Sequence, residues 1–217
     1  MIKSLAAIAI RAFLVVFVMA GCAFAATITY DTSTSLFVGD LTPLVLNSTG
    51  GTASATLTFF PQVAYPSGVP SGISYGHFIL ACPACTTQGI GTGYATFPNF
   101  TFDLTVTDVT NGGVGTFVGT ATGGSVYWDV SPITIDWAPL VLGPGTNNAT
   151  TGSFGPTIFE TNTPSYIVAP NSGDEGSLGR TSVQGLITAT PEPASMALMG
   201  AGLLALGGLL RRKMLAK

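Results

Sequence analysis

The sequence predicts an all-β protein, a single antiparallel β-sandwich or jelly-roll-like domain that carries an apolar targeting segment at each end. Apolar and polar residues alternate with a period of two in several segments, as half-buried strands require. Helices have little room, because no stretch of residues 26–190 without Gly or Pro exceeds 13 residues. The two longest such stretches, 26–38 and 99–111, are rich in threonine, whose branched Cβ favours strands.

The clearest predicted strand is 99–107, NFTFDLTVT, in which every second residue is apolar. The other segments with strand character are 27–30, 35–38, 53–59, 73–80, 115–120, 125–130, 133–137, 157–160, 165–169 and 181–189. Residues 111–113 (NGG) and 122–124 (TGG) are turn signals of the hairpin type. Residues 61–72, 143–156 and 171–177 are rich in Gly, Pro and polar residues, and we expect them to be loops.

The first 25 residues predict a signal peptide. Lys3 and Arg11 supply its basic region, and residues 12–20 form an uncharged, mostly apolar run. Nine residues are too few to cross a bilayer core of about 30 Å as a helix. Ala23 and Ala25 complete an A-x-A site, so we expect signal peptidase to cleave after Ala25.

Two alternatives for this N-terminus stay open. Met19-Ala20-Gly21 before Cys22 loosely resembles a lipobox, which would place the cleavage before Cys22 and lead to an acylated lipoprotein. A retained membrane anchor is the other alternative, although the short apolar run disfavours it. Cleavage after Ala25 fits the sequence with no exceptional residue.

The C-terminus has three consecutive blocks. The motif Pro191-Glu192-Pro193 comes first, and residues 194–210 follow as an uncharged apolar run. As a helix, this run of 17 residues covers about 25 Å, near the lower limit for a membrane span. The third block is the basic cluster Arg211-Arg212-Lys213, which we expect to act as a stop on the cytoplasmic side. The body would then lie outside the membrane and the basic tail inside.

These blocks, with Ala194 and Ser195 after the proline motif, resemble the PEP-CTERM sorting signal of Gram-negative bacteria. The resemblance covers about 27 residues and implies recognition by an exosortase, a membrane cysteine transpeptidase expected to cut near the motif. It also implies passage through the inner membrane as a precursor and delivery to the cell surface or to an exopolysaccharide matrix. An ordinary single-span anchor is the alternative, which shares the topology but not the processing.

Cys82-Pro83-Ala84-Cys85 is the sharpest motif between the two ends. Such a C-x-x-C pair can be a structural disulfide, a redox centre or half of a zinc site. Redox use normally needs a helix that begins at the first Cys, and zinc needs four ligands, whereas residues 26–190 offer only His77 besides these two thiols. In an oxidising compartment we favour a disulfide between Cys82 and Cys85.

No catalytic residue, cofactor or metal is predicted. His77 is the one histidine, and its neighbours look like strand residues, so a surface position on a strand is favoured over a catalytic base. A glycosidase needs two facing carboxylates, and the order of the chain shows no such pair. The acids concerned are Asp103, Asp108, Asp129, Asp136, Glu160, Asp174 and Glu175. Residues 171–175 concentrate oxygen donors but lack the order of a calcium-binding EF-hand loop.

Composition excludes two classes of protein. The chain is 47% hydrophobic and 8% charged, which is the reverse of a disordered protein. Its seven Lys and Arg residues are too few for a nucleic-acid surface, so no nucleic-acid partner is expected. Arg180 is the one base in residues 26–190, which hold nine of the ten acids and carry a formal charge of −8. We expect an acidic domain coated with Thr and Ser, which repels polyanions unless cations bridge them.

Three functions are therefore considered. The first is a non-enzymatic, exported surface or matrix protein that associates with exopolysaccharide. The second is a carbohydrate-binding or adhesive module, which would expose a planar strip of aromatic side chains such as Trp128, Trp137 or the tyrosines. The third is a secreted hydrolase, which would need clustered carboxylates or a partner for His77.

Overall fold

The computed structural model describes residues 26–35, 44–144, 149–172, 178–190, 200–205 and 207. Within it, Thr27–Ala189 form one compact unit, called the body below. The predicted signal peptide, with Ala23 and Ala25, lies outside the described residues. So do the motif Pro191-Glu192-Pro193 and the basic cluster Arg211-Arg212-Lys213.

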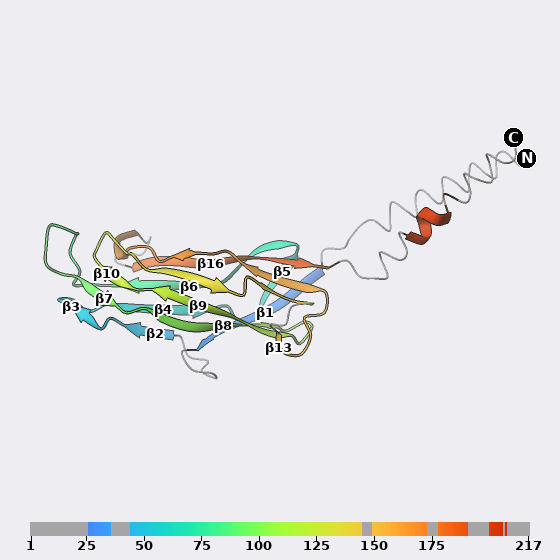
Figure 1. The fold of residues 1–217 in the computed structure, drawn as a ribbon, viewed down its shortest axis with the longest axis horizontal. Helices are drawn as coiled ribbons and strands as arrows, with labels where there is room; N and C mark the ends of the chain where they lie inside the picture. Colours follow the sequence, from blue (N-terminus) through green and yellow to red (C-terminus); the bar gives the residue numbers. More distant parts are fainter. Residues whose placement is uncertain are drawn as a thin grey trace, which may run out of the picture. The chain divides into compact units, whose positions relative to one another are not determined.

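The body is built from two large sheets and one small sheet (Figure 1). Sheet A has the order β15 (Ser165–Tyr166), β11 (Thr134–Ala138), β9 (Val114–Thr122), β8 (Phe100–Asp108), β1 (Ala26–Ser35) and β5 (Tyr65–Val69), with β13 (Ala149–Thr151) paired to β9. Sheet B has the order β12 (Val141–Leu142), β14 (Thr157–Thr161), β16 (Leu178–Ala189), β6 (Ser71–Ala81), β4 (Thr56–Pro61) and β2 (Leu44–Asn47). Sheet C has the order β10 (Gly124–Val126), β7 (Ala95–Phe97) and β3 (Gly50–Gly51). A single 3-10 turn, η1, spans Pro170–Ser172.

Sheets A and B pack face to face through aromatic side chains. The ring of Phe78 in β6 lies edge-on to Phe102 in β8, with centroids 5.5 Å apart, and Tyr75 in β6 meets Phe117 in β9 at the same distance. Edge-to-face contacts of this kind add stability beyond the burial of apolar area. The burial of every second residue along β8 shows why the alternating sequence forms a strand with one face in this core.

The predicted β-rich architecture is confirmed: β6 contains residues 73–80 and β16 contains 181–189, and the predicted strand 99–107 lies in β8 from Phe100 onward. The pairs of strands whose register is defined here all run antiparallel. The segment 36–38 lies outside the described residues.

Several predicted boundaries were wrong. Residues 61–72, predicted as a loop, contain strand β5 and the start of β6. Because β5 lies at the edge of sheet A, it tolerates Pro66, which cannot donate to a ladder. Strand 125–130 ends at Val126, and 165–169 keeps only a two-residue strand. The glycines at 123–124 form no hairpin, because β9 and β10 belong to different sheets.

Residues 200–205 and 207 are helical and lie within the apolar run 194–210. The rest of that run falls outside the described residues. Among the residues that the structure describes, no helix has the length and apolar character needed to cross a membrane.

The strand registers define two opposite ends of the body. At one end Ala189, the last residue of β16, lies opposite Thr157, and the β8–β9 hairpin turns after Asp108. The side chain of Asn111 in this turn donates a hydrogen bond of 3.1 Å to the hydroxyl of Thr157. At the opposite end β6 finishes at Ala81 and leads into Cys82. Residues 48–55, 82–97 and 123–130 form this second end, which we call the tip.

Candidate functional site

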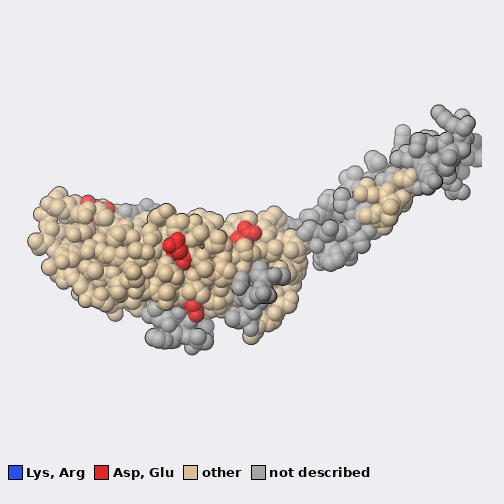
Figure 2. Space-filling model, in the orientation of Figure 1, with Lys and Arg blue, Asp and Glu red and all other residues tan. Residues whose placement is uncertain are grey.

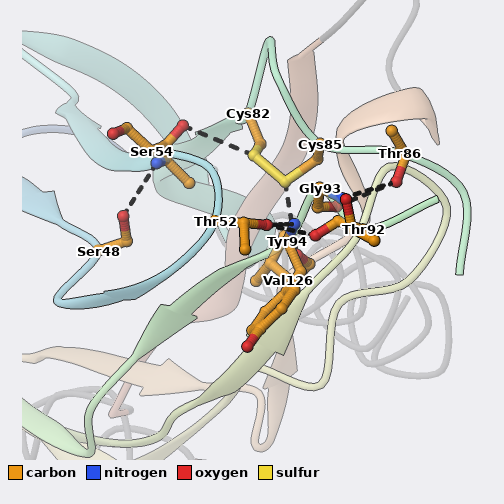
Figure 3. Close-up of a disulfide and its surroundings, with 11 residues drawn as sticks. Ser48, Thr52, Ser54, Cys82, Cys85, Thr86, Thr92, Gly93, Tyr94 and Val126 are labelled. Carbon is orange, nitrogen blue, oxygen red and sulfur yellow. Dashed lines mark hydrogen bonds between the residues drawn. A yellow bond between two sulfur atoms is a disulfide. The ribbon is translucent and has the colours of Figure 1, made fainter.

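The tip is anchored by a disulfide between Cys82 and Cys85 (Figure 3). Both cysteines are buried, and they follow strand β6 instead of starting a helix. The motif therefore lacks the helix N-terminus that a thioredoxin-like redox centre uses. The Sγ atom of Cys85 lies 3.4 Å from the carbonyl oxygen of Val126, so the disulfide contacts strand β10. A disulfide sulfur carries no hydrogen, so this contact is not a hydrogen bond.

The loop 86–93 follows the disulfide and is closed by hydrogen bonds. The backbone N–H of Thr86 donates to the carbonyl oxygen of Gly93 at 2.9 Å, and the N–H of Gly93 donates to the Thr86 hydroxyl at 3.0 Å. The N–H of Gln88 donates to a carboxylate oxygen of Asp129 at 2.8 Å. Ile90 is 85% exposed within this loop. The carboxylate of Asp129 thus serves the structure of the tip.

Sheet C presents one face to the core and one to solvent. Ala95, Phe97 and Val126 are buried on the core side. The alternation of a strand places the residues between them on the other face. There Thr96 lies opposite Ser125 in the register of β7 and β10, with their hydroxyl oxygens 3.4 Å apart.

Tyr94 and Tyr127 continue this outer face, because each lies two residues from Thr96 or Ser125 and just past the end of β7 or β10. Their rings are stacked, with centroids 5.7 Å apart and planes inclined by 28°. Both side chains are half-buried, and within the described part of the chain neither hydroxyl has a hydrogen-bond partner. Because the phenols are aligned in space by two strands far apart in sequence, no sequence pattern marked this pair.

The two tryptophans do not form the exposed strip that was considered for carbohydrate binding. Trp137 is only 4% exposed, and its indole N–H donates to the Ser165 hydroxyl at 2.9 Å inside the body. Trp128 is half-buried and packs against the core. The alternation of side chains along β11 places Trp137 on the core side, so packing explains its position.

His77 lies half-buried on the outer face of sheet B, where its ring stacks on Phe60 with centroids 5.2 Å apart. Strand β6 holds it opposite Phe60 in β4 and opposite Ser182 in β16. This is the strand position that the sequence favoured.

The acids of sheet A are dispersed. Asp103 lies opposite Val118 of β9, whereas Asp136 of β11 lies opposite Thr120. Strand β9 separates the two carboxylates, so their Cα atoms are more than about 9 Å apart. On the face drawn in Figure 2 the acidic side chains are separated by neutral surface, and no Lys or Arg of the described residues is visible.

Asp108 has a role that the sequence did not predict. It is fully buried at the end of β8. Phe102, Leu104 and Val106 face the core, and Asp108 is the next residue in this alternation. Its carboxylate accepts the backbone N–H of Asn111 at 2.9 Å and the side-chain amide of Asn111 at 2.7 Å. Asp108 therefore fixes the β8–β9 turn and is not a surface acid.

No group of three or more His, Cys, Asp or Glu that could hold a metal occurs among the described residues. In the segment considered for calcium, the backbone N–H of Asn171 donates to the Trp128 carbonyl oxygen at 3.0 Å. Asp174 and Glu175 lie outside the described residues.

Two buried phenols tie the strands of the core. The hydroxyl of Tyr30 donates to the carbonyl oxygen of Ser74, and the hydroxyl of Tyr75 donates to that of Glu160, both at 2.8 Å. Burial raises the pKa of Tyr30 above its ordinary value, with Tyr65 as a smaller cause. Burial likewise raises the pKa of Tyr75, with smaller effects of Tyr30 and Glu160. Both groups therefore remain neutral hydrogen-bond donors at neutral pH.

Comparison with known proteins identifies the C-terminus. Residues 189–213 match the family model of the PEP-CTERM protein-sorting motif. The tail is a PEP-CTERM sorting signal. The match begins at Ala189, the last residue of β16, so no residue separates the PEP-CTERM match from the final strand of the body.

The PEP-CTERM match covers Pro191, Glu192 and Pro193 as well as the basic cluster, as the resemblance of the sequence implied. A PEP-CTERM signal marks an exported protein that an exosortase sorts at the membrane. The rest of the chain matches no family model. No curated protein and no solved structure matches the chain.

Proposed function

We propose that this protein is a non-enzymatic structural component of the cell surface or of an exopolysaccharide matrix. The observation that carries the proposal is the PEP-CTERM signal, which follows the last strand of the body without a further folded domain between them. Signal peptidase removes residues 1–25, the apolar tail holds the precursor in the inner membrane, and exosortase then cuts near Pro191-Glu192-Pro193. The mature chain is the β-rich body.

The body suits a structural role. Its dispersed carboxylates, the position of His77 on a strand and the packing of Cys82 with Cys85 in a disulfide favour such a role over that of a hydrolase. A disulfide supports the stability of a domain in an oxidising compartment. The acidic surface keeps the exported domain soluble and disfavours direct binding to polyanions.

A carbohydrate-binding module is the second candidate, and one specific observation favours it. The stacked pair Tyr94–Tyr127 lies on the solvent side of a small sheet, beside the hydroxyls of Thr96 and Ser125. Aromatic rings with a polar edge are suited to surfaces that contact both apolar and polar parts of a ligand.

Replacement of Pro191-Glu192-Pro193 by three alanines tests the sorting step. The expected result is an unprocessed precursor in the inner membrane, detected by fractionation and immunoblotting. Pro83→Ala, at an exposed proline of the tip, is the matched control and should leave delivery unchanged. Normal delivery of the triple-alanine variant would contradict the proposal.

A further inference from the structure

We propose that the outer face of sheet C binds a neutral glycan chain, with sugar rings packed against Tyr94 and Tyr127 and sugar hydroxyls bonded by Thr96 and Ser125. We call these four residues the platform. The inference deepens the proposed matrix role and rests on it for the identity of the natural ligand.

The platform offers hydroxyl groups for hydrogen bonds and aromatic rings for stacking, on the same face of sheet C. Ser125 and Thr96 are direct cross-strand partners, and each tyrosine lies two residues further along its chain segment, where the two rings stack with centroids 5.7 Å apart. A sugar ring has apolar C–H faces and a polar rim of hydroxyls. It can therefore pack a C–H face on a phenol ring while its rim reaches the neighbouring hydroxyls.

Strand β3 borders the platform and consists of two glycines, Gly50 and Gly51. Gly50 of β3 lies opposite Thr96, so the third strand of sheet C presents no side chain beside the hydroxyl pair. Gly51 has a φ of +99°, and a Cβ at this position would overlap the backbone carbonyl of Tyr94. The glycine is thus required for β3 to approach β7 closely, and both glycines of β3 are exposed to solvent.

The backbone around the platform is held before any ligand arrives. The carbonyl oxygen of Tyr94 accepts the N–H groups of Thr52 and Ala53, each at 2.9 Å, and the N–H of Tyr127 donates to Val130 at 2.9 Å. The contact of Cys85 with Val126 adds the disulfide to this frame (Figure 3). Groups that are already ordered lose less conformational entropy on binding, which favours affinity.

Charge selects the class of ligand. The four platform residues are uncharged, and the body has a formal charge of −8, so a polyanion is repelled. Single-stranded nucleic acids also stack on aromatic side chains, but they need a basic groove for their phosphates, and Arg180 is the one base of the body. A neutral glycan is the ligand that uses stacking and hydroxyls without charge.

Isothermal titration calorimetry on the full-length chain tests the proposal, in a detergent whose head group contains no sugar. Maltohexaose and cellohexaose are the neutral probes, and an alginate hexamer is the anionic probe. We expect at least one neutral hexasaccharide to bind and the alginate hexamer not to bind. Tyr127→Ala should weaken that binding by about tenfold, because one stacking surface is lost. Tyr127→Phe, which keeps the ring, should stay within about threefold of the unchanged chain.

The double variant Thr96→Val/Ser125→Ala should weaken binding several-fold while the tyrosine stack is kept. Tyr166→Ala, at a 64% exposed tyrosine of β15, is the matched control and should leave the affinity unchanged. Circular dichroism melting checks that each variant is folded. The proposal is overturned if neither neutral probe binds, if Tyr127→Ala binds as tightly as the unchanged chain, or if alginate binds more tightly. Because the assay uses purified chain, its failure is distinct from a failure of sorting in cells.

Discussion

The phenolic hydroxyl of Tyr30 in β1 donates a hydrogen bond of 2.8 Å to the carbonyl oxygen of Ser74 in β6. This bond joins sheet A to sheet B inside the core, where Tyr30 is fully buried. Its ring also meets Tyr75 and Phe159 of sheet B edge-on. One residue of the first strand thus links the face-to-face sheets by both a polar and an apolar contact.

Tyr30→Phe should lower the free energy of unfolding by about 1–2 kcal/mol, because the carbonyl oxygen of Ser74 loses this donor while the ring remains. Urea denaturation followed by circular dichroism measures the change. Tyr166→Phe, in which the tyrosine is exposed, is the control and should have no effect. Equal free energies of unfolding for Tyr30→Phe and the unchanged chain would show that the hydrogen bond between the sheets does not stabilise the fold.

Stability should fall at alkaline pH. The raised pKa values of Tyr30 and Tyr75 mean that the unfolded chain releases these protons first, near pH 10, while the folded chain keeps them. Their contribution to stability is complete below pH 10 and declines above it, by up to about 1.4 kcal/mol per pH unit for each tyrosine. Unfolding measured between pH 8 and about 12 tests this. The double variant Tyr30→Phe/Tyr75→Phe should have a shallower decline, and an unchanged slope would contradict the assignment.

The disulfide should stabilise the tip without being essential for the fold. A four-residue loop closed by a cross-link corresponds to about 2 kcal/mol in the chain-entropy model, and reduction or Cys82→Ala/Cys85→Ala should cost about this amount. Differential scanning calorimetry with and without reductant measures the shift. Thiol titration of the denatured, non-reduced mature protein should find no free thiol from this pair, and two free thiols would refute the bridge.

Gly185 should not tolerate a side chain. A Cβ there would overlap the carbonyl oxygen of Glu160 and the ring of Tyr75, whose hydroxyl crosses this position to reach Glu160. Gly185→Ala should therefore destabilise the body by about 1–3 kcal/mol or more. Gly72→Ala is the matched control in β6, because its Cβ would meet no atom within 4 Å. Equal melting temperatures for the two variants would contradict the packing described here.

The alternation of apolar residues was enough to predict the β-rich class and the strands β6, β8 and β16. It did not predict β5, because Pro66 and the glycines of 61–72 are typical of loops, and only the position at the sheet edge makes them compatible with a strand. The burial of Asp108 was not predicted, because it depends on the turn that Asn111 completes.

The candidate platform could not be predicted for a related reason. Tyr94 and Tyr127 are more than 30 residues apart, and their stacking follows from the pairing of β7 with β10. Long-range pairing of this kind leaves no local pattern in the sequence. The sorting signal was predictable, because its three blocks are contiguous in the sequence. A membrane and an exosortase recognise such blocks directly, so the signal does not depend on the fold of the body.

Mass spectrometry of the exported protein tests processing by signal peptidase and exosortase, since it locates both ends of the mature chain. We expect an N-terminus at Ala26 and a C-terminus close to Pro191-Glu192-Pro193, with the apolar run and the basic cluster removed. A surface protein whose C-terminus is still Lys217 would contradict exosortase processing.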